Sequence, residues 1–318
     1  MYTARKEEKD MIYTVTLNPA LDRAINVETL LEDDTTRISS ERHYAAGKGI
    51  DVSRVIKELG GQSVALGLIG GYDGLHLEGL LINAGVMTQF TKISNETRTN
   101  IILKENSTGR QFVISATGPE VSATEIGQFY NHIIDIQGMS YLVLSGSLPR
   151  GLTPNLYGQL ILAGRQKGAF IFLDADGDAL TESIDYRPTG IKPNIHELSR
   201  LVGKNLRNES EILDACESIH KRGIPLILVS RGRDGLVLST EKEKIKAVGP
   251  PVEVESTVGA GDSALAGFVL EHSFNKDLSE CVRMACAAGT ATAHTPGTEL
   301  CHRDEIEEIM PLVEVSIL

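Results

Sequence analysis

Two glycines and an aspartate stand close together near the carboxyl end of the chain, in the run Gly259-Ala260-Gly261-Asp262. Glycines let the backbone turn tightly, so that consecutive N–H groups can point to one place. A strand-like run from Val252 leads into this turn, and a helical pattern follows it. The start of a helix adds the positive end of its dipole. The run therefore predicts an anion site, with phosphate as the favoured anion.

Asp262 would place a carboxylate inside this anion site, where it repels a phosphate unless it has a chemical task. Two tasks would justify it: taking a proton from an attacking hydroxyl, or holding a cation through water. Both belong to phosphoryl transfer. The alternative is a helix N-cap, a position that favours aspartate.

The same run, extended through Ser263 and Ala264, also matches the G-x-G-x-x-A fingerprint of dinucleotide sites. That fingerprint needs a second strand ending in an acidic residue about 20 residues later. Asp277 and Glu280 have this spacing, but they fall at the start of a helical stretch. The sequence therefore disfavours a nicotinamide site, and it contains no G-x-x-x-x-G-K-[ST] loop either.

Three charged side chains elsewhere could bind a polar substrate. Lys48 lies between Gly47 and Gly49 where a helical pattern begins, which suits a small-molecule contact or a simple tight turn. Asp22 follows the first predicted strand and could accept hydrogen bonds from two sugar hydroxyls, or could be a turn aspartate. Arg98 could bind a phosphate already carried by the substrate, or be an exposed charge on an edge strand.

Two further polar runs follow predicted strands. Lys192, Asn194 and Glu197 suit Mg²⁺ held through waters beside a phosphate, although Asn194 and Glu197 also match a capping box. The second run could line a nucleotide or form a hairpin turn, and its members are Ser230, Gly232 and Gly235.

Short β-rich runs alternate with helical patterns along almost the whole chain. The strand-like runs are 12–17, 63–69, 141–145, 169–174, 189–192 and 225–230. The helical segments are 49–59, 74–84, 123–136, 153–166, 195–202, 210–221, 260–272, 278–294 and 303–310. This alternation predicts an α/β fold with a mostly parallel sheet and helices on both faces. Ligands bind beyond the carboxyl ends of such strands, so the polar runs should gather in one cleft.

Two segments read as antiparallel hairpins rather than as parts of a parallel sheet. One pairs 97–104 with 110–114 around a turn, and the other pairs 235–239 with 244–248. We expect the first to form a small β lid, built from 18–45 and 86–115. The prediction is one domain over 11–318, preceded by an N-terminal extension at 1–10.

Composition excludes several classes of protein. The chain has 318 residues, with 31 Lys and Arg against 43 Asp and Glu, giving a net charge of −12. This balance disfavours a nucleic-acid or anionic-membrane surface, and no apolar run is long enough to span a membrane. The four cysteines form no C-x-x-C pair, and residues 1–10 lack the apolar core of a signal peptide. We expect a cytoplasmic protein with reduced thiols.

The motifs together resemble one family. They are the runs TLNPALD at 16–22, GKGI at 47–50, SGSLP at 145–149, KPN at 192–194 and STVGAGD at 256–262. In these runs the chain resembles the carbohydrate-kinase family that includes ribokinase and the ATP-dependent phosphofructokinases. Its phosphosugar branch comprises 1-phosphofructokinase, the minor-type 6-phosphofructokinase and tagatose-6-phosphate kinase. The tail at 287–301 is similar to the minor-type enzyme, whereas 118–120 and 47–49 are similar to 1-phosphofructokinase.

The resemblance implies a ribokinase-like three-layer sandwich and a set of roles. Asp262 would take the proton from the sugar hydroxyl, and the backbone of 259–261 would form the anion hole. The implied substrate-binding residues are Asp22, Gly47, Lys48, Asp51, Arg98 and Ser147. The implied ATP-binding residues are Lys192, Asn194, Ser230, Gly232, Gly235, Thr257, Gly259 and Gly261. Glu197 would hold Mg²⁺ through water, and a potassium ion would lie near Ser256, Val258 and Gly297. The lid would pair two subunits into a homodimer.

Two positions depart from the family pattern. The family usually has asparagine where this chain has Asp51, and glycine where it has Ala46. An extra carboxylate would repel a phosphorylated sugar unless it is protonated or turned away. We expect a phosphofructokinase that makes fructose 1,6-bisphosphate from the 1- or 6-phosphate. The alternatives are a tagatose-6-phosphate kinase, another sugar kinase, or a catalytically silent sugar or nucleotide sensor.

Overall fold

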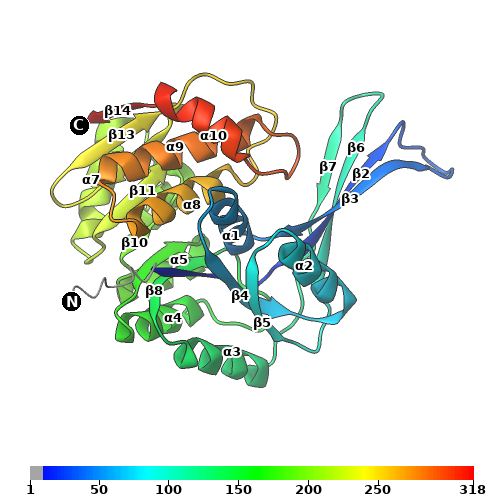
Figure 1. The fold of residues 1–318 in the computed structure, drawn as a ribbon, viewed down its shortest axis with the longest axis horizontal. Helices are drawn as coiled ribbons and strands as arrows, with labels where there is room; N and C mark the ends of the chain where they lie inside the picture. Colours follow the sequence, from blue (N-terminus) through cyan, green and yellow to red (C-terminus); the bar gives the residue numbers. More distant parts are fainter. Residues whose placement is uncertain (1–9) are drawn as a thin grey trace, which may run out of the picture.

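The computed structural model describes residues 10–318. The predicted extension at 1–10 therefore lies outside the described residues, apart from Asp10. Within the described part, a large sheet is covered by helices on both faces, and a second, smaller sheet projects from one side (Figure 1).

Ten strands form the large sheet, in the order β14-β13-β12-β11-β10-β9-β8-β1-β4-β5. The seven strands from β11 to β5 in this order are parallel, whereas β12, β13 and β14 pair antiparallel. The parallel strands are β1 (Met11–Thr16), β4 (Ser63–Ile69), β5 (Met87–Lys92), β8 (Met139–Ser145), β9 (Phe170–Asp174), β10 (Gly190–Ile191) and β11 (Leu226–Ser230). The antiparallel strands are β12 (Leu236–Ser239), β13 (Lys244–Val248) and β14 (Glu314–Ile317).

Alternate side chains of the strands pack into two cores, one on each face of the sheet. In β8, Leu142 and Leu144 enter one core, while Tyr141 and Val143 enter the other. The first core is covered by α3 (Ala123–Asp135), α4 (Leu156–Gln166), α5 (Gly177–Ser183), α6 (Ile195–Val202) and α7 (Glu209–His220). The opposite face is covered by α1 (Lys48–Glu58), α2 (Gly71–Asn83), α8 (Ala260–Ser273), α9 (Leu278–His294) and α10 (Arg303–Ile309). The expected three-layer arrangement is therefore present.

The smaller sheet has the order β3-β2-β6-β7 and forms the projecting arm in Figure 1. Its strands are β2 (Ala20–Val27), β3 (Ile38–Ala46), β6 (Arg98–Glu105) and β7 (Gln111–Ile114). The hairpin predicted at 97–114 is confirmed, since Ile101 pairs with Ile114 antiparallel. We call this sheet the lid.

Part of the predicted lid was assigned to the wrong sheet. Residues 87–92 form β5, which pairs in parallel with β4 at the edge of the large sheet, so the second lid segment begins at β6 and not at 86.

The prediction of a strand from Val252 is also wrong, because 249–258 form a loop. Two consecutive prolines, at 250 and 251, cannot donate ladder hydrogen bonds there, and Val254 is exposed.

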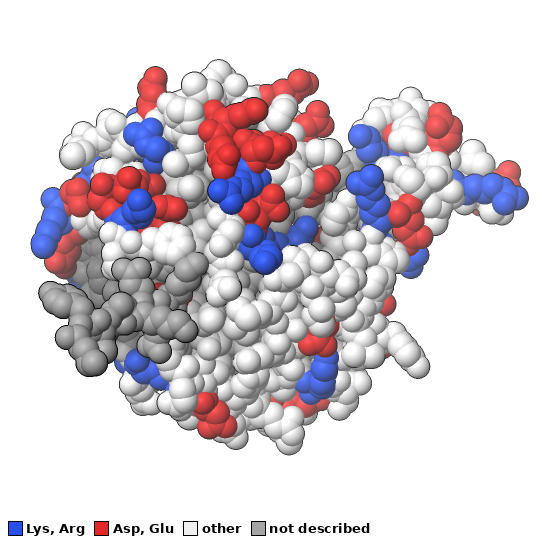
Figure 2. Space-filling model, viewed as in Figure 1, with Lys and Arg blue, Asp and Glu red and all other residues white. Residues whose placement is uncertain are grey.

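Between residues 10 and 318, every helix is too short or too polar to cross a lipid bilayer. On the face shown in Figure 2, Lys and Arg side chains alternate with Asp and Glu across the described residues, and they do not merge into one basic surface.

Candidate active site

The start of α8 forms a tight cradle of backbone around its first N–H groups. Gly259, the N-cap, has φ of 78°, in the left-handed region. A Cβ at Gly259 would lie 2.5 Å from Leu300 Cδ2, and a Cβ at Gly261 would lie 3.0 Å from Lys192 Nζ. The ammonium group of Lys192 therefore lies against the positive end of this helix, and both would attract an anion.

Asp262 lies in the first turn of α8 and is only 8% exposed. The alternative role of N-cap is wrong, because Gly259 occupies that position and no side chain caps the helix. Burial and the carboxylates of Asp174 and Asp51 raise the pKa of Asp262 well above its ordinary value, although Lys48 and Lys192 oppose them. A carboxylate with a raised pKa is better suited to accept a proton near neutral pH.

Asp174 ends β9 and binds two lysines from distant parts of the chain. Its Oδ1 accepts a hydrogen bond from Lys48 Nζ at 3.0 Å, and its Oδ2 lies 3.2 Å from Lys192 Nζ. Burial raises the pKa of Asp174, but the two ammonium groups outweigh burial and hold that pKa below its ordinary value. Burial alone would lower the pKa of Lys48, yet Asp174 and Asp262 raise it on balance. Lys48 is therefore charged beside Asp174.

Lys192 and Asn194 follow β10, and Asn194 begins α6. Asn194 Oδ1 accepts from the Glu197 N–H at 2.9 Å, and Glu197 Oε2 accepts from the Asn194 N–H at 2.8 Å. The capping box that the sequence allowed is therefore present. It holds the Glu197 carboxylate, which is 7% exposed, within electrostatic range of Lys48.

The loops that were predicted to line a nucleotide lie at the ends of neighbouring strands. Ser230 forms a parallel bridge with Asn194, which joins the loops after β10 and β11. Gly232 and Gly235 form the turn between β11 and β12, so the hairpin-turn interpretation is confirmed for them: the Gly235 N–H donates to the Gly232 carbonyl at 3.0 Å. A Cβ at Gly235 would lie 2.0 Å from the Ala247 carbonyl oxygen, so that position requires glycine.

The loop before α8 lies beside the end of α9. The Ser256 N–H donates to the Ala293 carbonyl at 3.4 Å, and the Val258 N–H donates to Ser256 Oγ at 3.2 Å. Thr257 stands between these two residues. Gly297, with φ of 68°, lies in the turn after α9. The two regions expected to hold a potassium ion are thus neighbours.

Another group of polar side chains lies where the lid meets the large sheet. Asp22, on β2, is buried and accepts a hydrogen bond from Asn100 Nδ2 at 2.8 Å. Burial raises the pKa of Asp22, and Asn100 and Arg98 partly offset this. Arg98, which begins β6, donates to the Asn18 carbonyl at 2.9 Å and to the Ala116 carbonyl at 2.7 Å.

Two more of the predicted substrate-binding residues lie near this group. Asn18 Nδ2 donates to Ser147 Oγ at 3.3 Å, which links the first strand loop to the loop after β8. Gly47 is the N-cap of α1, with φ of 133°, and a Cβ there would lie 2.7 Å from Thr16 Cγ2. The backbone of Gly47 therefore packs closely against the end of β1.

Asp51 lies in the first turn of α1, and its side chain is 14% exposed. Arg54 Nη1 is 3.1 Å from Asp51 Oδ1 and also donates to the Ala45 carbonyl. Burial raises the pKa of Asp51 most strongly. The Arg54 guanidinium lowers this pKa and the charge of Asp22 raises it, and the result is a pKa of about 7.

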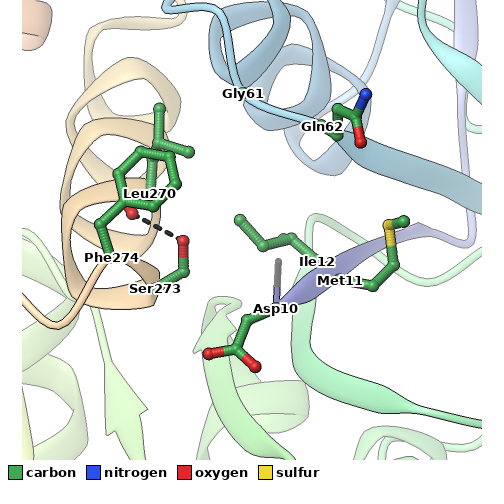
Figure 3. Close-up of a pocket in the computed structure, with 8 residues that line it drawn as sticks. All are labelled: Asp10, Met11, Ile12, Gly61, Gln62, Leu270, Ser273 and Phe274. Carbon is green, nitrogen blue, oxygen red and sulfur yellow. Dashed lines mark hydrogen bonds between the residues drawn. The ribbon is translucent and has the colours of Figure 1, made fainter. Parts of the chain in front are cut away.

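The charged side chains of these groups lie near one another at one edge of the large sheet. Electrostatic contacts link Asp262 to Lys48, Lys192, Asp174 and Asp51, and link Asp51 to Asp22. A cavity of about 20 Å³ lies elsewhere, at the start of β1 and the end of α8, and is lined by Ile12, Gly61 and Phe274 (Figure 3). It is remote from Asp262, which lies at the opposite end of that helix.

Sequence reasoning missed Asp174. The signal was present, because the run Leu173-Asp174-Ala175-Asp176 ends a buried strand at the edge where ligands bind. It also assigned Lys48 to the sugar alone, whereas the structure pairs Lys48 with Asp174 and places it within the electrostatic reach of Asp262.

Comparisons with known proteins agree with this geometry. The family described as pfkB family carbohydrate kinase matches residues 15–305. The 1-phosphofructokinase of Bacillus subtilis (strain 168) is 33% identical over 308 residues, which cover 97% of this chain and 100% of the relative. The D-tagatose-1-phosphate kinase of Bacillus licheniformis is 34% identical over 90% of this chain and 94% of its own length. The crystal structure of phosphofructokinase-2 from Escherichia coli in complex with potassium has a TM-score of 0.90 at 32% identity, covering 95% of this chain and 98% of that chain.

Proposed function

The chain belongs to the pfkB family of carbohydrate kinases, with a ribokinase-like fold, and we propose that it is an ATP-dependent phosphofructokinase. As a kinase of this family it transfers phosphate to a sugar hydroxyl. The proposed acceptor is fructose 1-phosphate or fructose 6-phosphate, and the product is fructose 1,6-bisphosphate. One observation carries the proposal: a buried carboxylate, Asp262, lies at a helix N-terminus beside the side chains of Lys48 and Lys192.

In the proposed reaction, Asp262 takes the proton from the acceptor hydroxyl. The hydroxyl oxygen attacks the γ-phosphorus of ATP in line, the bond to the β,γ-bridging oxygen breaks, and ADP leaves. The negative charge on the transferring phosphoryl group is stabilised by the N–H groups at 259–261 and by the Lys192 ammonium. Asp174 holds Lys192 in place, and Lys48 adds to the positive charge of the site.

The donor set also fits the cations expected here. Glu197 offers one buried carboxylate within electrostatic range of Lys48, and one of its oxygens accepts the Asn194 N–H; it would hold Mg²⁺ through water, with ATP as the other ligand. Mg²⁺ would neutralise charge on the phosphates. Ser230, Gly232, Gly235, Thr257 and Asn194 would line the nucleotide. A potassium site near Ser256, Val258 and Gly297 is supported by the closeness of the two loops and by the potassium complex of the Escherichia coli relative.

The acceptor would bind between the lid and the start of α1. Asp22, Gly47, Ser147 and Asp51 would contact the sugar. Arg98 would bind its phosphate, because its position at the base of the lid is fixed by two backbone carbonyls. Closure of the lid would exclude water that could otherwise accept the phosphoryl group.

We also propose that two chains pair through their lids. All four residues of the edge strand β7 are exposed, including Phe112, Val113 and Ile114, and Ile38 is exposed on the other edge strand, β3. Exposed apolar edge strands of this kind are typical of surfaces that a partner covers. We further propose that the protein acts in the cytoplasm, and the four buried, unpaired cysteines support this.

The test is ADP release from ATP with fructose 1-phosphate, fructose 6-phosphate, tagatose 6-phosphate, tagatose 1-phosphate and free fructose. A kcat/KM for one of the two fructose phosphates at least about tenfold above all others supports the proposal, a margin of 1.4 kcal/mol in binding the transition state. A preference for a tagatose phosphate would make the protein a tagatose-phosphate kinase. No turnover with any acceptor would favour a sugar or nucleotide sensor.

A further inference from the structure

The orientation of the Asp22 carboxylate is set by one amide side chain. Asp22 lies on β2 and is 7% exposed, and its Oδ1 accepts a hydrogen bond from Asn100 Nδ2 at 2.8 Å. Within residues 10–318 the structure gives this carboxylate no other hydrogen-bond donor. Its second oxygen, Oδ2, therefore keeps its capacity to accept a hydrogen bond from a ligand.

Asn100 faces Asp22 with the donor end of its amide. The two residues lie side by side in register on the parallel strands β2 and β6. On its other side, Asn100 Oδ1 accepts the Ala116 N–H at 3.1 Å. A backbone N–H can only donate, so this contact assigns the amide oxygen to Ala116 and the NH₂ group to Asp22.

The loop that supplies the Ala116 N–H is itself tied to the acceptor side of the site. It follows β7, and its Ala116 carbonyl accepts from Arg98 Nη1 at 2.7 Å. The next carbonyl, that of Thr117, accepts from Asn18 Nδ2 at 3.1 Å. The Asn100 amide is therefore held on both sides, and it cannot turn around without losing both of its hydrogen bonds.

The same hydrogen bond acts on the charge of Asp22. Burial raises the pKa of Asp22, and the Asn100 hydrogen bond is the largest effect that lowers it, followed by the charges of Arg98 and Arg54. A hydrogen bond donated to a carboxylate favours its ionised form. An ionised Asp22 can accept from Asn100 and from a sugar hydroxyl at the same time, one on each oxygen.

The neighbouring elements also carry titratable groups at this end of the lid. They are Arg54 and Asp51 on α1, Tyr44 and His43 on β3, Asp73 and His76 on α2, and Arg98 on β6. Arg98 and Arg54 act on Asp22 through their charge alone. Within the described residues none of these groups donates a hydrogen bond to Asp22, so no side chain already in place can replace Asn100.

We propose that Asn100 is a positioning residue for the acceptor: its amide keeps the Asp22 carboxylate ionised and turned so that the free oxygen accepts a hydrogen bond from a sugar hydroxyl. Asn100 acts through Asp22 and does not have to touch the sugar. This inference rests on the proposed function, since it assumes that a sugar binds at Asp22. Loss of the amide should therefore affect the acceptor and leave ATP binding unchanged.

The test compares Asn100→Asp and Asn100→Ala with the wild type in steady-state turnover of fructose 1-phosphate and fructose 6-phosphate. At about pH 8, kcat/KM for the better acceptor should fall at least about tenfold in both variants, because a hydrogen bond to a charged group is lost. The loss should appear mainly as a higher KM for the sugar. The KM for ATP should stay within about twofold of the wild type, because Lys192 and the start of α8 are unchanged.

A pH series from about 8 to about 5.5 separates positioning from damage to the fold. The ratio of variant to wild-type kcat/KM cancels the titrations that the proteins share, such as that of the sugar phosphate near pH 6. In Asn100→Asp the introduced carboxyl group gains a proton as pH falls and can then donate to Asp22, so the ratio should rise at least about threefold. In Asn100→Ala, Asp22 loses the hydrogen bond that lowers its pKa and gains its proton at a higher pH, so the ratio should fall at least about twofold.

Asn26→Asp is the matched control. Asn26 lies on the same strand as Asp22, toward its other end, and its amide donates to Ser40 Oγ on β3 at 2.8 Å. The substitution makes the same change of charge on the lid, away from the acceptor. Its kcat/KM should therefore follow that of the wild type throughout the pH series.

Ratios that do not change with pH in the Asn100 variants would overturn the inference, because damage to the fold has no such opposite pH dependence. So would an Asn100→Ala enzyme that keeps the wild-type kcat/KM for the sugar phosphate. Thermal denaturation establishes that each variant is folded, and Asn100→Ala decides alone if Asn100→Asp is not. If the wild type turns over a fructose phosphate and the ratios stay flat, the inference fails and the proposed function stands. If the wild type turns over no sugar phosphate, both fail.

Discussion

Asp174 fixes two ammonium groups beside the phosphoryl site, because each of its oxygens faces one of them. The carboxylate is fully buried, and Lys192 is 5% exposed. A buried ion pair is costly to form, and it is still more costly to leave half formed. This arrangement places two ion pairs of the site on a residue that touches no substrate in the proposed reaction.

Replacement of Asp174 by Asn should therefore destabilise the fold and weaken ATP binding together. We expect the free energy of unfolding to fall by about 3 kcal/mol, because the buried Lys192 loses its partner, while Lys48 is partly exposed. The KM for ATP should rise as Lys192 leaves the cradle. Urea denaturation and ATP titration measure the two effects.

The matched control is Asp185→Asn, which breaks the exposed pair with Arg222. Exposed pairs contribute at most about 1 kcal/mol, so its urea midpoint should stay close to that of the wild type. Equal midpoints for Asp174→Asn and the control would contradict the structural role of Asp174.

At the level of elements, the N-terminus of α8 depends on the backbone of Gly259. Its φ of 78° is unfavourable for any residue with a Cβ, and a Cβ there would meet Leu300 Cδ2 at 2.5 Å. A side chain at this position would shift the N–H groups that the transferring phosphoryl group needs. The start of helix α8 and the proposed phosphoryl transfer therefore both require Gly259.

Gly259→Ala should lower kcat at least about tenfold, because the loss of one well-placed oxyanion donor costs 10²–10³ in other enzymes. Gly127→Ala is a matched control in α3, where nothing lies within 4 Å of the added Cβ. It should leave kcat unchanged and stabilise the protein by about 0.5–1 kcal/mol. Steady-state kinetics of both variants test whether catalysis requires glycine at position 259. A Gly259→Ala enzyme with wild-type kcat would refute this requirement.

The exposed strands of the lid lead to a separate prediction about the oligomeric state of the protein. Val113→Lys places a charge in the centre of the exposed β7 strand, and it should convert a dimer into monomers at micromolar concentration in light scattering after size exclusion. Leu162→Lys, on the exposed side of α4, is the control that should remain dimeric. A wild type that is monomeric at these concentrations would exclude the proposed pairing.

The same elements show what local pattern can and cannot predict. Strands such as β4, in which every residue is buried, have an apolar run that marks them, and a hairpin such as β6–β7 has a clear turn. By contrast β5 reads MTQFTK and is only partly buried, so nothing in its sequence assigns it to the large sheet rather than to the lid. Lys48 and Asp174 are 126 residues apart, and only the strand order brings them together. Motifs at strand ends therefore predict which residues gather, but not which of them bind each other.

For the whole molecule, the net charge of −12 opposes two anionic substrates. Local positive charge must overcome it: Lys48, Lys192, Arg98 and the start of α8 supply this charge at one edge of the sheet. The same edge holds the carboxylates of Asp262, Asp51 and Asp22, each within electrostatic range of a lysine or an arginine. Positive charge placed beside these carboxylates is what the account requires of the fold as a whole.

The most direct test of the central claim is the Asp262→Asn enzyme, measured for both turnover and ATP binding. Removal of the proposed base should lower kcat at least about a hundredfold, while the Kd for ATP, measured by calorimetry, should stay within about threefold of wild type because the cradle and Lys192 are unchanged. An Asp262→Asn enzyme that turns over at close to the wild-type rate would contradict the assignment of Asp262 as the base and, with it, the mechanism proposed for this site.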